Sequence, residues 1–306
     1  MKIVLFISQL ILFIGLAPLL SGLITRIKNN IRMRKGQSVF QPYYNLAKFF
    51  SKGEVVSDTA SWIFRVTPFV VFSSSLAAAL FIPVFIFSSP ALHIGDFLVL
   101  IFIFALGRFF LALAALDTGS AFGGMGSSRE MFISSLVEPA LCLAIFSLSL
   151  EFGSTDITAF SGMHPVSVSS FAASATLFLV TLAETSRVPV DNQETHLELT
   201  MVHEAMVLEY SGRSLAIIEA ASYIKQMVLF FLIAQVIFPI GLPAISGPVQ
   251  SALWVLWYLI RIIIIAAAVA LVEVTVAKMR LFRVADFLGF AFILGVIAVV
   301  CAVLGV

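Results

Sequence analysis

Carboxylates and histidines are concentrated in one segment of the chain, between Glu184 and Gly212. This acidic segment holds six of the 17 acidic residues and two of the four histidines, and long apolar runs lie on both sides of it. Carboxylate and imidazole groups take up and release protons, so we expect the segment to handle protons or to contact a redox partner. Its candidate residues are Glu184, Arg187, Asp191, Glu194, His196, Glu198, His203, Glu204 and Glu209.

The spacing within the acidic segment favours proton exchange over metal binding. Glu194 and Glu198 are four residues apart, so on a helix they would share a face, where repulsion favours protonation of one of them. His196 and His203 would lie about 10.5 Å apart along a helix axis, too far for both to bind one metal ion. The alternative interpretation is a solvated, charged loop.

The two cysteines give no sign of a metal or disulfide site. Cys142 and Cys301 both lie in apolar runs, and neither has the CxxC or CxxH spacing of an iron–sulfur or zinc ligand set. We therefore expect no metal ligands and no cofactor in this chain. Any redox centre would belong to a partner.

Several ionisable residues fall inside or at the ends of apolar runs: Arg108, Glu138, Glu219, Lys225, Arg261 and Glu273. A charge at the centre of a membrane span costs roughly 2.5–3.5 kcal/mol to insert, and such residues usually mark ion paths. We expect that role for Arg108, Arg261 and Glu138, which precedes a helix-kinking proline. For the other three, near helix ends, snorkelling to the membrane surface is the simplest explanation.

The composition indicates an all-α polytopic membrane protein with about eight transmembrane helices. The chain is 60% hydrophobic and 11% charged, whereas about 25% of the residues in a soluble domain are charged. Runs of about 20 apolar residues cross the hydrocarbon core. We expect a single membrane domain, 1–306, with spans at 3–24, 64–88, 95–116, 130–151, 167–185, 219–241, 251–275 and 285–305. The fifth has the shortest apolar stretch.

Basic residues predict the orientation in the cytoplasmic membrane. Lysines and arginines gather in alternate loops, and loops rich in these residues face the cytoplasm. Both termini would then lie on the non-cytoplasmic side. The predicted cytoplasmic loops are 25–63, 117–129, 186–218 and 276–284.

Two of these loops have local structure of their own. Residues 42–50 predict a short amphipathic helix, which would lie at the lipid interface, dock a cytoplasmic subunit, or do both. In the loop before the fourth span, Ser127 and Glu130 have the spacing of a capping box, which predicts a helix that begins at 130. The candidate docking residues are Arg34, Lys35, Gln41, Tyr43 and Lys48.

These residues resemble a known family. Glu184, Arg187, Pro189, Asp191, Glu194, Glu198 and the run from Glu209 to Gly212 are similar to the signature loop of the respiratory complex I subunit 1 family, also called the H subunit. The run LDTGSAFGGMGSSRE and the later Glu138-Pro139 resemble its hydrogenase-4 and formate hydrogenlyase subunit 4 branch. The first loop, with Arg34, Gln41 and Lys48, also resembles the family pattern. Gln37, Asn45 and His196 depart from it, which weakens the case for a quinone site.

The resemblance implies an anchor and ion-coupling subunit. The partners it implies are a nickel–iron hydrogenase-type large subunit, an iron–sulfur small subunit and antiporter-like membrane subunits. The acidic segment would then couple electron transfer to proton or sodium movement, and Glu138 would begin a lateral path of charges. Iron–sulfur clusters and a nickel–iron centre would be carried by the partners.

Two alternatives remain. One is a quinone-binding H subunit of an NADH:quinone-type dehydrogenase. The other is a stand-alone ion-coupled transporter, which the absence of an evident internal repeat disfavours. A nucleic-acid-binding protein is not indicated, because the net charge is +1 and no basic cluster has interleaved aromatic residues.

Overall fold

The computed structural model describes residues 2–82, 95–157, 167–191, 201–238 and 248–305. Helices account for most of them, and within these ranges only one isolated bridge, Asp96 to Asp156, has β geometry. The helices are α1 (Lys2–Ile31), α2 (Gln41–Phe50), α3 (Trp62–Phe81), α4 (Phe97–Asp117), α5 (Ala121–Phe152), α6 (Val168–Glu184), α7 (His203–Val207), α8 (Gly212–Ile237), α9 (Pro248–Thr275) and α10 (Leu281–Leu304).

The described residues confirm a polytopic helical membrane architecture. Seven of their helices (α1, α3, α4, α5, α8, α9 and α10) are long and apolar enough to cross a membrane. The predicted fifth span is α6, an apolar helix of 17 residues, at the lower limit for a crossing. The predicted interfacial helix is also present as α2, which has no buried residue.

The predicted start of the fourth span at 130 is wrong. Helix α5 begins at Ala121, and Ser120 is its N-cap, with its Oγ accepting a hydrogen bond from the backbone of Gly123 at 3.1 Å. Ser127 lies inside the helix, where its hydroxyl donates to the carbonyl of Ala112 in α4 at 2.8 Å. The glycines that were expected in a loop, at positions 123, 124 and 126, therefore lie inside α5, in the part of the helix that Ser127 bonds to α4.

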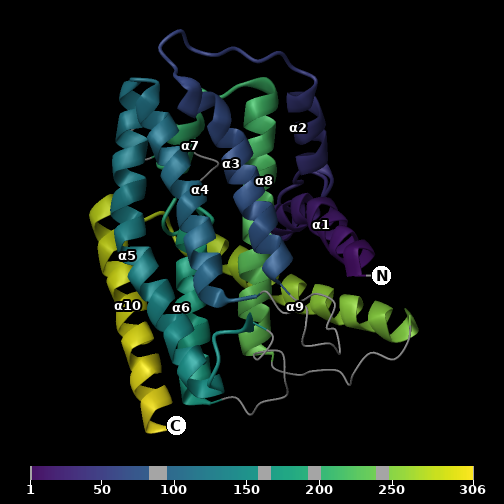
Figure 1. The fold of residues 1–306 in the computed structure, drawn as a ribbon, viewed down its shortest axis with the longest axis vertical. Coiled ribbons are helices and arrows are strands. Elements are labelled where there is room, and N and C mark those ends of the chain that lie inside the picture. The colour runs from purple at the N-terminus through teal and green to yellow at the C-terminus, as the bar shows by residue number, and fades with distance from the viewer. Residues whose placement is uncertain (1, 83–94, 158–166, 192–200, 239–247, 306) are drawn as a thin grey trace.

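Six helices form an upright bundle, and two cross it obliquely. Figure 1 shows α3, α4, α5, α6, α8 and α10 running along the long axis, while α1 and α9 are strongly inclined to them. Helix α8 is the central one, with an almost continuous buried run from Ile224 to Val236. In contrast, α10 packs on α5 and α6 with one face and exposes Phe282, Phe290 and Val303 on the other, as expected for a lipid-facing helix.

One end of the bundle carries the polar connections. Figure 1 shows α2, α7 and the turn between α4 and α5 at this end, and the C-terminus at the opposite one. The chain between α2 and α3 is tied to the start of α8 here. The Oγ of Ser211 donates to the carbonyl of Val55 at 3.0 Å, and the N–H of Val55 donates back to it at 2.8 Å. We call this end of the bundle the polar end.

Candidate functional site

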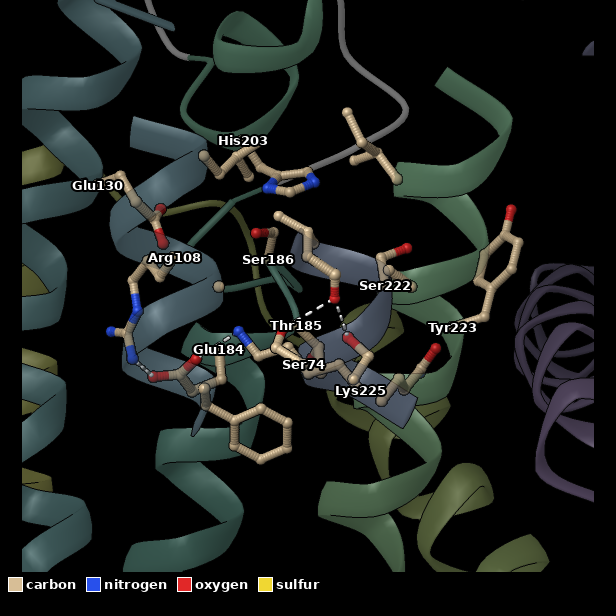
Figure 2. A pocket seen from close by; sticks show the side chains of 18 of the residues that line it. Ser74, Arg108, Glu130, Glu184, Thr185, Ser186, His203, Ser222, Tyr223 and Lys225 are labelled. Carbon is tan, nitrogen blue, oxygen red and sulfur yellow. Dashed lines mark hydrogen bonds and ion pairs between the residues drawn. The ribbon is translucent and has the colours of Figure 1, made fainter. Parts of the chain in front are cut away.

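The carboxylate at the end of α6 lies at the centre of a row of ion pairs. Glu184 lies 3.0 Å from Arg108 of α4 and 2.6 Å from Lys225 of α8, and only 3% of its side chain is exposed. Arg108 also contacts Glu138 of α5 at 3.4 Å. Charges from four helices therefore alternate in sign across the bundle, and Figure 2 shows the pairing of Glu184 with Arg108. We call this set the Glu184 row.

A second cluster begins three residues later, where the chain turns out of α6. Ser186 adopts a positive φ of 50°, and the following arginine points back into the protein. Arg187 lies 2.9 Å from Glu273 of α9 and donates to the Oε1 of Gln226 in α8 at 3.1 Å. Lys28 of α1 lies 3.2 Å from the same Glu273. This Glu273 cluster joins three helices to the acidic segment.

Asp191 holds the next part of the acidic segment in place. One carboxylate oxygen lies 2.7 Å from Lys278, and the other accepts the backbone N–H groups of Val202 and His203 at 3.2 and 3.3 Å. Arg129 of α5 donates to the carbonyl of Met201 at 2.8 Å. These bonds fix the start of α7 against the polar end of α5.

The close approach of α7 to α5 requires a glycine. A Cβ at Gly126 would lie 2.9 Å from the Cβ of Ala205 and 3.1 Å from the Cγ of Met206. A side chain at this position would push α7 away from the bundle. The glycine-rich run before Glu130 therefore serves helix packing.

Burial makes the paired charges dependent on one another. Removing one partner of a buried ion pair leaves an uncompensated charge, which typically costs about 3–5 kcal/mol. The side chains of Glu184 and Glu273 are each 3% exposed, so bulk solvent screens neither of them. Within the Glu184 row, and likewise within the Glu273 cluster, a protonation change at one group therefore affects its partners.

Two cavities adjoin these charges. The smaller, about 70 Å³, lies beside the Glu184 row and is also lined by Glu130, Ser186, His203 and Tyr223 (Figure 2). The larger, about 260 Å³, lies among α1, α2, α7 and α8, and most of its lining residues are polar or charged. Because one water takes about 30 Å³ in the liquid, the larger cavity has room for several waters.

Tyr210, which follows α7, anchors the polar end by a different interaction. Its ring stacks on Phe64 of α3 with centroids 3.9 Å apart, and its hydroxyl donates to the carbonyl of Phe64 at 2.9 Å. Burial raises the pKa of this hydroxyl well above its usual value. Tyr210 therefore stays neutral and packs as part of the core.

Seven of the predicted site residues meet in the structure. Those brought together in the two clusters or against Asp191 are Glu184, Arg187, Asp191, Arg108, Glu138, Lys225 and Glu273. His203, Glu204 and Glu219 line the larger cavity, and Glu219 accepts a hydrogen bond from the hydroxyl of Tyr223 at 2.7 Å. Glu194, His196 and Glu198 lie outside the described residues.

Other predicted residues lie elsewhere. Glu209, Arg34, Lys35 and Lys48 are exposed, and Gln41 is bonded to Asn45 at 3.0 Å within α2. Tyr43, also in α2, donates its hydroxyl to the carbonyl of Gly15 in α1, and burial raises its pKa. Arg261 lies apart from both clusters, against Trp257, Tyr258 and Gln235.

The snorkelling explanation is wrong for Lys225 and Glu273. Each turns inward to a charged partner, because the helices around it supply one at the same depth. Sequence reasoning also missed four site residues: Lys28, Gln226, Lys278 and Glu130. Gln226 had a signal, since it follows Lys225 in an otherwise apolar run.

Comparison with known proteins agrees with this architecture. The family model described as NADH dehydrogenase matches residues 1–304. Hydrogenase-4 component C of Escherichia coli (strain K12) is 32% identical over 291 residues, which cover 93% of this chain and 91% of that protein. Formate hydrogenlyase subunit 4 of the same strain is 31% identical over 280 residues, or 90% of each chain.

A solved structure shares the fold at low sequence identity. It is the archaeal respiratory membrane complex called membrane-bound sulfane sulfur reductase. One of its chains superposes with a TM-score of 0.80 at 18% identity, covering 97% of this chain and 99% of that one. At this identity the match establishes the fold only.

Proposed function

The chain belongs to the NADH dehydrogenase family, and from this premise we propose that it is the membrane-anchor and ion-coupling subunit of a complex-I-like hydrogenase. It would dock a cytoplasmic redox arm and link electron transfer to proton or sodium translocation. The observation that carries this proposal is the Glu184 row, in which buried charges from four helices alternate in sign.

The energetic cost of the network supports a coupling role. Well-packed apolar residues usually stabilise a protein at least as well as a buried ion pair does, so structure alone does not require these charges. Ionisable residues inside membrane helices usually serve proton or ion movement. Water in the two cavities would connect the Glu184 row with the Glu273 cluster, since both cavities are lined by Arg187 and Ser186.

The partners we propose follow from the two surfaces that the network reaches. At the polar end, α2 and the exposed Arg34, Lys35 and Lys48 would contact an iron–sulfur small subunit and a hydrogenase-type large subunit, with this end facing the cytoplasm. On the flank, Glu138 has 41% of its side chain exposed in the middle of α5. An antiporter-like membrane subunit would cover this carboxylate, which lipid would not solvate.

We assign the redox centres to these partners. Iron–sulfur clusters, and a nickel–iron centre if the large subunit retains one, need cysteine ligands in sets. Cys142 and Cys301 lie on different membrane helices, α5 and α10, without such a set around them. This chain's own residues would anchor the arm and respond to its charge.

The quinone-binding alternative has one observation in its favour. The larger cavity lies between α1, α2 and α8, where a ligand could reach both the redox arm and the bilayer. Its lining, however, includes Lys28, Asp191, Glu204 and Glu273, and binding pockets for apolar rings are mostly apolar. This lining favours water and ions over a quinone.

The test uses the intact complex, purified in mild detergent through a tag on this subunit. We expect dye-linked hydrogen evolution from the complex and ion uptake when it is reconstituted in vesicles with its electron donor. In Glu184→Gln we expect ion uptake per electron to fall at least tenfold while dye-linked activity persists.

Glu151→Gln is the matched control. Glu151 is a partly buried carboxylate near the end of α5 that accepts a hydrogen bond from Ser167 at 2.5 Å, and it belongs to neither the Glu184 row nor the Glu273 cluster. Unchanged ion uptake by Glu184→Gln would contradict the coupling role. Ion transport by this chain alone would instead support a stand-alone transporter.

A further inference from the structure

We propose that His203 relays protons between the larger and the smaller cavity, an inference that rests on the proposed function and adds a specific connection to it. His203 begins α7, and its side chain lines both cavities. Figure 2 shows it at one end of the smaller cavity, away from the pairing of Arg108 with Glu184.

The partition between the cavities contains few groups that could carry a proton. The other residues that line both are Ser21, Ser186, Arg187, Ile218, Ser222 and Tyr223. Hydroxyl groups of serine and tyrosine do not ionise near neutral pH, and an arginine keeps its charge. Imidazole is the side chain that ordinarily gains and loses a proton there, so His203 is the group in the partition suited to transfer.

The backbone around His203 is held in a way that suits a relay. Its own N–H and that of Val202 donate to Asp191, which in turn pairs with Lys278. Arg129 bonds the carbonyl of Met201, just before it. The segment is thus anchored through its backbone, which leaves the imidazole to face the cavities.

Charged groups face both cavities, and the carboxylates and lysines among them would exchange protons with the ring through water. On the smaller cavity they are Arg108, Glu130, Glu184 and Lys225. On the larger cavity they are Lys28, Asp191, Glu204, Glu219 and Glu273, and Arg187 faces both. His203 is therefore the connection between the Glu184 row and the carboxylates of α7, α8 and α9.

The proposed step moves one proton and no electrons. One ring nitrogen accepts a proton from a water in the larger cavity, and the opposite nitrogen releases its own proton to a water in the smaller cavity. The ring is neutral before and after, with its tautomer exchanged, and rotation about the side-chain bond restores the starting state. Transfer in the other direction follows the same steps in reverse.

The experiment compares coupled proton transport with the activity of the redox arm. In intact complex reconstituted in vesicles, we expect His203→Gln to lower the rate of proton uptake at least tenfold, since general acid–base groups typically contribute 10²–10⁴-fold. Dye-linked hydrogen evolution should stay at the wild-type rate. Leu208→Gln is the control, because Leu208 is exposed just after α7.

A second variant separates proton transfer from folding. His203→Ala should show the same defect and recover proton uptake when imidazole is added, which a merely structural role would not produce. Wild-type proton uptake by His203→Gln, or no recovery of His203→Ala with imidazole, would overturn the relay while leaving the proposed function in place. No proton or sodium uptake by the wild-type complex would overturn both.

Discussion

Arg108 and Arg261 are both part of membrane helices and both buried, but their described contacts are with different kinds of group. Arg108, 8% exposed, lies between the carboxylates of Glu138 and Glu184. Arg261, 2% exposed, lies over the rings of Trp257 and Tyr258, with centroids at 4.8 and 5.5 Å. Arg261 also donates a hydrogen bond to the amide oxygen of Gln235, at 3.4 Å.

The described contacts of the two arginines differ in whether they can change protonation. The groups around Arg108 can change their protonation, so its environment can store and release charge. The described contacts of Arg261 are two aromatic faces and an amide, which do not gain or lose protons near neutral pH, and the ring quadrupoles attract its guanidinium. From these described contacts we predict that Arg108 acts in the coupling network and that Arg261 serves helix packing, in place of the ion path expected for Arg261 from the sequence.

The largest effect should come from Arg108→Leu. It would leave Glu184 with one cationic partner and Glu138 with none in the row, at an expected cost of about 3–5 kcal/mol in the free energy of unfolding. Thermal unfolding of the detergent-solubilised complex would measure it. Adding Glu184→Gln should recover part of the loss, and a double variant as unstable as the single one would contradict the pairing.

A smaller effect is expected from Arg261→Met, which keeps an unbranched apolar stem. The loss of the cation–π contacts should cost about 1–2 kcal/mol, and ion uptake per electron should equal that of the wild type. Ion transport in vesicles, measured together with thermal unfolding, would separate an effect on transport from an effect on stability. A transport defect without loss of stability would place Arg261 in the ion path and end the contrast with Arg108.

Glu138→Gln should change stability less than Arg108→Leu does, because the contact of Glu138 with Arg108 is the longest of the row. Its effect should be on assembly. We expect the amount of co-purified neighbouring membrane subunit to fall, as judged by mass spectrometry of the tagged complex. Unchanged subunit ratios together with unchanged ion transport would show that Glu138 takes part neither in subunit assembly nor in ion coupling.

The smallest effect on the subunit itself is expected from a third arginine, the exposed Arg34. Arg34→Ala should alter stability by no more than about 0.5 kcal/mol, as for most surface substitutions. The cytoplasmic arm should nevertheless dissociate at lower salt concentration, which sedimentation of the complex would show. Lys52→Ala, at the exposed end of the α2 region, is the matched control.

The arrangement of spans was predictable because membrane insertion depends on local hydrophobicity. The apolar runs predicted the position of all eight helices, including the short α6. The ends of the helices were harder to predict than their positions, since α5 and α8 begin earlier than expected, at Ala121 and Gly212. At those ends, contacts with neighbouring helices decide where the helix starts, and hydrophobicity carries no information on them.

The members of the site were easier to predict than its pairings. Charges in apolar runs are conspicuous, so Arg108, Glu184 and Glu273 were found. Which charge meets which depends on how helices distant in the sequence are placed, as in the contact of Lys28 with Glu273. In the sequence, Lys28 and Lys278 are explained by the excess of basic residues in cytoplasmic loops. Nothing in their position indicates that they pair with Glu273 and Asp191.

The direction of the Glu184 row has a consequence for membrane voltage. The row passes from α5 to α4, α6 and α8, so it crosses upright helices instead of following one of them (Figure 1). A transmembrane potential does about 2.3 kcal/mol of work per 100 mV on a charge that crosses the whole bilayer, and almost none on a charge that stays at one depth. A charge that moves from helix to helix along this row would therefore sense only the part of its path that lies along the membrane normal.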